Sequence, residues 1–154
     1  MERVDKVIDF FLSKESMSPK KLQKMLYYAY AWTLALLNED EDHLENKLFD
    51  GKFEAWVHGP VLPSVYVRYK AYGWNDIPQK ADVKASDFSP EVKDVLEQVW
   101  DGYGGMNGNQ LEAISHKEAP WKRARTDVPA YEASHNEISD REIFKFYNWQ
   151  ANRV

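Results

Sequence analysis

The longest apolar segment of the chain begins at a Ser-Pro pair, and it constrains the fold more than any other feature. Ser18 is a favoured helix N-cap, and Pro19 suits the first helical position because the N–H that it lacks would have no intrahelical partner there. The segment then places apolar or small side chains on one helical face: Leu22, Met25, Leu26, Ala29, Thr33 and Leu36. Aromatic side chains widen this face: Tyr27, Tyr28, Tyr30 and Trp32. We therefore predict a central helix over residues 19–37.

Five other segments predict helices, from their apolar spacing or from capping residues. Residues 2–14 carry apolar side chains at helical intervals. Ser89 and Pro90 repeat the cap-and-proline start. The remaining three helices are residues 63–72, closed by Gly73, a short helix capped by Asn109, and a last helix capped by Ser139 or Asp140.

A short β element is predicted near the middle of the chain. Residues 53–57 alternate in polarity and predict one strand. His58-Gly59-Pro60 is predicted to end this strand, because proline removes a backbone donor and glycine bends the chain freely. Three further stretches are predicted connections: residues 38–45, residues 75–87 and the glycine-rich residues 102–109. The predicted fold is mainly α, a single compact domain over residues 1–154 with about six helices and a small β element near residues 53–57.

The residue inventory excludes several kinds of chemical site. The chain has no cysteine, which excludes disulfides, iron–sulfur clusters and cysteine-based zinc sites. Its four histidines lie far apart and lack the spacing of zinc enzymes: His43, His58, His116 and His135. The glycines of residues 102–108 do not match a phosphate-binding loop. We therefore expect no metal and no cofactor.

One enzyme hypothesis remains open. The sequence has no Gly-x-Ser-x-Gly, and Ser115 and His116, as neighbours on a helix, do not face each other. His116 is interpreted as a structural residue that donates to a backbone carbonyl. A small hydrolase that uses His58 and His116 with a nearby acid is the alternative, and the geometry of that pair would decide it.

Charge and hydropathy favour a protein partner. The 20 Lys and Arg residues are scattered among 25 Asp and Glu residues, and the net charge of −5 argues against a nucleic acid partner. The sequence shows neither a secretion signal nor an apolar run of membrane-spanning length, so we expect a cytoplasmic protein without a membrane partner. Aromatic residues make up 14% of the chain, and we expect some of them at the surface as binding anchors.

Two segments of the chain resemble a known family. They are Leu22-Gln23-Lys24-Met25-Leu26-Tyr27-Tyr28-Ala29-Tyr30-Ala31-Trp32, and Glu54-Ala55-Trp56-Val57-His58-Gly59-Pro60-Val61 followed by Val65-Tyr66 and Tyr69-Lys70. Leu111-Glu112-Ala113-Ile114-Ser115-His116 and Pro120-Trp121 extend the pattern, with Ser115 standing where threonine is commoner. Together these residues resemble the Panacea domain, the SocA-like antitoxin family of bacteria, their phages and prophages.

The resemblance implies a mostly helical fold without known catalytic activity. It implies an antitoxin that binds a cognate protein toxin encoded by an adjacent gene, and it leaves the identity of that toxin open. A second implied mechanism is a proteolytic adaptor that delivers the toxin to a cellular protease. The expected partner-binding residues lie around the strand and the helix after it: Trp56, His58, Tyr66, Tyr69 and Trp74. The acidic residues 39–42 are the alternative docking surface for a basic toxin.

Overall fold

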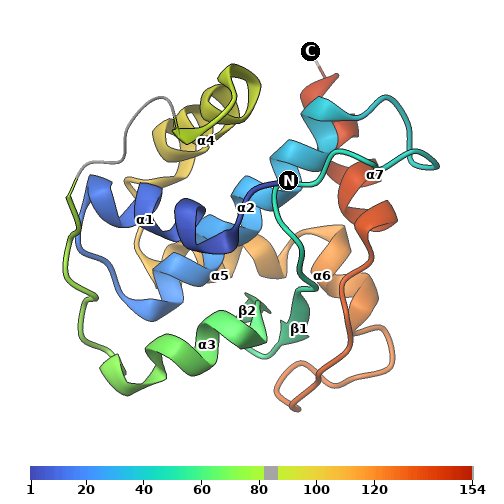
Figure 1. Ribbon diagram of the computed structural model, residues 1–154. Coiled ribbons are helices and arrows are strands. Elements are labelled where there is room, and N and C mark those ends of the chain that lie inside the picture. Colours follow the sequence, from blue (N-terminus) through green and yellow to red (C-terminus); the bar gives the residue numbers. More distant parts are fainter. Residues whose placement is uncertain (82–86, 154) are drawn as a thin grey trace.

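The computed structural model describes residues 1–81 and 87–153, and this part of the chain is mainly helical (Figure 1). Its elements are α1 (Val4–Lys14), α2 (Pro19–Leu37), β1 (Glu54–Trp56), β2 (Gly59–Val61), α3 (Pro63–Tyr69), the 3-10 turn η1 (Lys70–Tyr72), α4 (Pro90–Tyr103), α5 (Gly108–His116), α6 (Ala119–Ala124) and α7 (Asp140–Ala151). The predicted mainly α fold with a small β element is confirmed.

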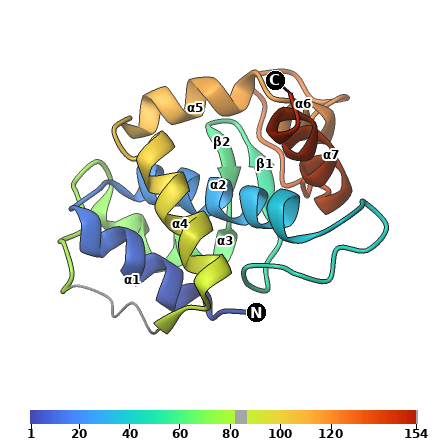
Figure 2. The same ribbon diagram turned by 90° about the horizontal axis from the view of Figure 1, so that it is seen from above.

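Helix α2 is the centre of the fold, as its sequence predicted. Ser18 Oγ accepts a hydrogen bond from the Lys21 backbone N–H, and Pro19 opens the helix. Fourteen of the 19 residues of α2 are buried. The helix contacts α1, α3, α4, α5, α7 and β2, which surround it in two perpendicular views (Figures 1 and 2). A helix that is apolar on nearly all sides is stable only when neighbours cover it in this way.

A buried polar network ties the helices together inside the aromatic core. The hydroxyls of Tyr28 and Tyr147 both donate to Oε1 of Glu118, at 3.0 and 2.7 Å. The Tyr28 ring stacks on Tyr103 with centroids 4.1 Å apart, and the Trp32 indole donates to the Tyr103 hydroxyl at 2.9 Å. These contacts join α2, α4 and α7 to the residue that caps α6.

The β element is a hairpin and not the predicted single strand. Val57 and His58 form the turn, and Gly59 and Pro60 belong to the returning strand β2, so the prediction that they end the β structure was wrong. Gly59 has a positive φ of 104°, a conformation that favours glycine. Proline is tolerated here because β2 is an edge strand with β1 as its one partner in the described chain.

One helix boundary differs from its prediction, and one short helix was not predicted. Asn107, and not Asn109, caps α5 in a reciprocal capping box with Gln110, so the predicted loop over residues 102–109 is shorter. Ser139, one of the two predicted caps, is the N-cap of α7. The described residues contain seven α-helices. The helix that was not predicted is α6, because its six residues are too few to show apolar periodicity.

Leu36 was predicted on the apolar face of α2, but its side chain is exposed. Leu36 is 44% exposed, because Leu34 and Ala35 face the core in the last turn of α2. Of the predicted connection over residues 75–87, residues 82–86 lie outside the described residues, and residues 75–81 contain neither helix nor extended strand. Within the described chain, no helix combines the length and the hydropathy needed to cross a membrane.

Candidate functional site: an aromatic groove beside α3

A groove of about 620 Å³ lies beside α3, and we call it the α3 groove. Its walls come from the first turns of α2, the β1–β2 hairpin, the α3–η1 segment with Gly73 and Trp74, and residues 133–135. All five residues predicted to bind a partner line it: Trp56, His58, Tyr66, Tyr69 and Trp74. Their common location was predicted only as a sequence neighbourhood, and the fold brings them to one surface.

Trp56 forms the inner wall of the α3 groove and is held on several sides. Its ring packs edge-on against Tyr66, with centroids 4.9 Å apart, and against His135 at 5.5 Å. Its indole N–H donates to Glu54 at 2.8 Å, and its backbone carbonyl accepts from the Trp121 indole at 2.8 Å. Trp56 is therefore half-buried and fixed in position, which resolves whether it faces the core or solvent.

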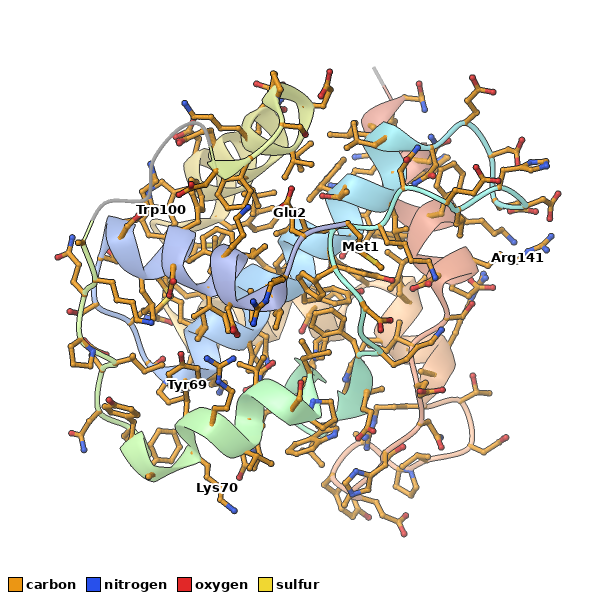
Figure 3. The ribbon with its side chains drawn as sticks, viewed as in Figure 1. Met1, Glu2, Tyr69, Lys70, Trp100 and Arg141 are labelled. Atoms are coloured by element: carbon orange, nitrogen blue, oxygen red, sulfur yellow. The ribbon has the colours of Figure 1, made fainter. Side chains whose placement is uncertain are left out.

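The outer aromatic residues of the groove are accessible. Tyr66 is 41% exposed and Trp74 is 90% exposed. Tyr69 is half-buried, packs against the core, and lies 6.3 Å from the Tyr72 ring. Figure 3 shows Tyr69 and Lys70 together at the end of α3. The aromatic row after Pro63 is thus a surface feature, apart from the inner side of Tyr69.

Two polar side chains of α2 form the floor and close the edge of the hairpin. Gln23 donates to the Leu62 carbonyl at 3.2 Å and accepts from the Leu62 N–H at 2.8 Å. Lys24 is 1% exposed, and its ammonium group donates to the Pro60 carbonyl at 3.1 Å. The Lys24 bond satisfies a carbonyl of the edge strand β2, and the Gln23 bonds satisfy the backbone of Leu62 directly after this strand.

Burial of Lys24 has an electrostatic consequence. Desolvation, with a smaller contribution from nearby Lys20, lowers the pKa of Lys24 from 10.5 to about 7, although Glu112 acts in the opposite direction. The ammonium is thus close to losing its charge at neutral pH. A side chain on Gly59 would collide with Lys24, so the glycine makes room for it.

Glu112 lies outside the groove lining and contacts two basic side chains of the groove, Lys20 and His58. It pairs with Lys20, and His58 Nδ1 lies 3.2 Å from its Oε1. Burial alone would raise the pKa of Glu112, but the hydrogen bonds from Lys20 and His58 hold it below its usual value. Burial lowers the pKa of His116, whose ring stacks on Trp121 at 4.2 Å. The prediction that His116 donates to a backbone carbonyl agrees with its bond to Val57.

The same cluster bears on the hydrolase alternative. His58 and His116 both face Glu112, but His116 Nε2 lies 3.9 Å from Glu112 Oε2, beyond hydrogen-bond distance. The Ser115 hydroxyl donates to the Glu112 carbonyl at 2.9 Å, and among its described contacts there is none with a histidine. Within the described chain, no three His, Asp or Glu side chains are placed to hold a metal ion. Within the described residues, Ser115 thus makes no nucleophile–base pair with His58 or His116.

The acidic loop, the other proposed docking surface, lies elsewhere and is partly neutralised. Arg141 pairs with Glu41 at 2.6 Å and with Asp42 at 3.2 Å, and Asp40 lies 2.8 Å from His43. Figure 3 shows Arg141 on the side of the molecule away from Tyr69. Three of the four acidic residues 39–42 thus already have a basic partner within the chain.

Several groove residues were not predicted from the sequence. Gln23 and Lys24 stood in the helix motif but off its apolar stripe, and His135 was interpreted as a plain surface residue. Arg125, which lies outside the groove, connects the hairpin to the segment that precedes residues 133–135 by donating to the carbonyls of Ala55 and Pro129, at 2.8 and 2.9 Å. The sequence did not show that Lys24 is buried, because its partner Pro60 is 36 residues away.

Most of the groove lies in a segment that is similar in sequence to known proteins. Residues 22–122 match the family model described as antitoxin SocA-like, Panacea domain. Over 112 residues the chain is 35% identical to a protein named Antitoxin SocA from Caulobacter vibrioides (strain NA1000 / CB15N). That alignment covers 65% of this chain and 55% of the relative, so the chain spans just over half the relative's length. No solved structure matches. The matched segment includes every wall of the α3 groove except residues 133–135 and the start of α2.

Proposed function

The chain belongs to the SocA-like, Panacea-domain family of antitoxins, and on this premise we propose that it neutralises a protein toxin by direct binding through the α3 groove. The relative's name, Antitoxin SocA, supports a toxin partner in general. The proposed toxin is the product of an adjacent gene, and the proposed binding unit is a single domain over residues 1–154.

The observation that carries the proposal is the convergence of accessible aromatic side chains on a pre-formed hollow. Tyr66 and Trp74 stand at the rim, and Trp56 forms the wall. Trp and Tyr dominate the binding energy of protein interfaces, because they bury a large area and lose few rotamers. The volume of about 620 Å³ lies within the range of ligand-binding clefts, roughly 300–1,000 Å³.

The wall of the groove is also rigid, which supports binding without rearrangement. Trp56 is held by Tyr66, His135, Glu54 and the Trp121 indole. A surface that is already ordered loses less conformational entropy when a partner binds. We therefore assign the toxin contact to the groove and not to the acidic loop, whose charges Arg141 and His43 already engage.

Co-expression with the toxin of the neighbouring gene tests the proposal. The parent protein should restore growth and co-purify with the toxin. Trp74→Ala should lose both effects, whereas Trp149→Ala should keep both, because Trp149 is also exposed, at 56%, but lies on α7 outside the groove. Equal rescue by the two variants would remove the groove from the proposal, and failure of the parent to rescue would reject the function.

The same co-expression experiment distinguishes direct neutralisation from proteolytic delivery, the two mechanisms that the family resemblance implies. Under direct neutralisation, the toxin accumulates in complex with the antitoxin, and growth returns in protease-deficient hosts as well. If toxin levels fall and rescue needs a cellular protease, the protein is a proteolytic adaptor and the occlusion mechanism is wrong.

A further inference from the structure

The charge of the α3 groove differs from that of the chain as a whole. The chain has a net charge of −5 with 25 Asp and Glu residues. Among the described residues that line the groove there is no Asp or Glu, while three lysines and two histidines are present: Lys20, Lys24, Lys70, His58 and His135. The overall acidity of the chain therefore does not describe the surface that the partner meets.

The basic residues of the groove are not equally neutralised. Lys20 and His58 pair with Glu112, and His135 pairs with Glu54. Among the described residues, Lys70 is exposed and has no acidic partner. Lys24 is 1% exposed, and its one hydrogen bond in the described structure is to the Pro60 carbonyl. Among the described residues, Lys70 is thus the exposed cation of the groove that lacks a carboxylate, whereas Lys24 is buried and close to neutral.

The groove places Lys70 and apolar side chains in a fixed order along α3. Next to the hairpin, Val61, Val65 and Tyr66 give it an apolar lining. Helix α3 runs from the hairpin to Tyr69 and Lys70 at its far end, as Figures 1 and 3 show. A ligand that lies along α3 would meet an apolar pocket first and a free ammonium group further along.

We propose that the α3 groove receives a segment of the toxin in which an apolar anchor is followed by an Asp or Glu side chain, with the anchor beside Trp56 and Tyr66 and the carboxylate on Lys70. The inference rests on the proposed function, and it adds the chemistry of the bound segment. Opposite charges across an interface set its orientation and reject wrong partners. A basic segment would instead place a like charge against Lys70.

A peptide selection tests the inference without needing the toxin. The purified full chain is used to select from a phage library of short random peptides, with Trp74→Ala as counter-selection. The enriched peptides should combine an aromatic or branched aliphatic residue with Asp or Glu. Raising the NaCl concentration from about 0.05 to about 0.5 M should weaken their binding to the protein. Basic or uncharged enriched peptides, or none that depend on Trp74, would overturn the inference.

Charge reversal provides the matched control. Lys70→Glu should lower the affinity for the tightest-binding acidic peptide by about tenfold or more. Replacing the Asp or Glu of that peptide with Lys should restore binding to the Lys70→Glu variant. Lys93→Glu makes the same charge change on α4, away from the groove, and should leave affinity unchanged. Equal affinity of the Lys70→Glu variant and the parent would contradict the assigned contact.

The outcomes for the inference and for the function are separate. Growth rescue by the parent together with selection of basic peptides would leave the antitoxin function standing and reject the acidic segment. Selection of acidic peptides that need Lys70, in a chain that fails to rescue growth, would support the groove chemistry and reject the function.

Discussion

Gly59 lies against Lys24, and a Cβ atom on Gly59 would stand 2.8 Å from the Lys24 Cε atom. The same Cβ would lie 2.9 Å from the Ser115 hydroxyl oxygen. The hairpin of the groove therefore rests on a side chain of the central helix, and no room is left for a larger residue at position 59. This contact links the groove to the stability of the whole fold.

Gly59→Ala should destabilise the protein by at least about 2 kcal/mol, because the new methyl group collides with Lys24 and the φ of 104° disfavours an L side chain. Chemical denaturation measures the loss. Gly105→Ala is the control: a Cβ there meets no atom within 4 Å, so its stability should change little. Equal effects of the two substitutions would mean that the contact is not tight.

Lys24→Met should change how stability depends on pH. The unfolded chain keeps this lysine protonated up to its ordinary pKa of 10.5, whereas burial lowers the pKa of Lys24 in the folded chain to about 7. Between these values the unfolded state binds more protons, so the stability of the parent rises with pH, by up to about 1.4 kcal/mol per unit. Methionine cannot titrate. In urea denaturation, the free energy of unfolding of the parent relative to that of the variant should therefore be higher near pH 9 than near pH 6. The same difference in free energy of unfolding at both pH values would contradict the assignment.

Glu118→Ala should be among the most damaging core substitutions. It leaves the buried hydroxyls of Tyr28 and Tyr147 without their acceptor, at about 1–3 kcal/mol for each unsatisfied group. Glu118→Gln keeps an oxygen acceptor and removes the charge. Thermal unfolding of both variants at neutral pH should place the glutamine variant close to the parent and the alanine variant far below it.

The glutamine variant should also differ from the parent in its pH profile. Burial raises the pKa of Glu118 above its ordinary 4.5, so the folded state holds this proton more tightly than the unfolded state. The contribution of the group to stability is therefore largest below pH 4.5 and is lost as pH rises through the raised pKa. Glu118→Gln should lack this decline, and an identical decline in both proteins would assign it to another group.

His58→Ala and Tyr69→Ala should separate binding from folding. The His58 side chain is 73% exposed, so its removal should leave the melting temperature unchanged. Tyr69 packs partly against the core, so its removal should lower stability as well. Loss of an anchor typically weakens binding by about 2 kcal/mol, roughly thirtyfold. Titration calorimetry with the toxin should detect this loss for Tyr69→Ala, and unchanged affinity for both variants would move the contact away from this part of the groove.

The sequence by itself determined the features that depend on neighbours along the chain. The starts of α2, α4 and α7 were predicted because Ser18, Ser89 and Ser139 cap their own helices within three residues. The apolar stripe of α2 predicted a central helix, because helical periodicity is a local property. The candidate residues near Trp56 and Tyr66 were found in the same way, from a motif within one short stretch.

Only the tertiary structure decided the features that depend on contacts between distant segments. Pro60 lies in a strand that pairs with β1, and Lys24, 36 residues earlier, satisfies the Pro60 carbonyl. The short helix α6 carries no periodic signal, and Trp121 and Arg125 connect it to the hairpin. The basic lining of the α3 groove likewise arises in an acidic chain because folding places the carboxylates of Glu54 and Glu112 behind the wall. Net charge is a sum over residues, whereas the field in a groove depends on which side chains the fold brings to its surface.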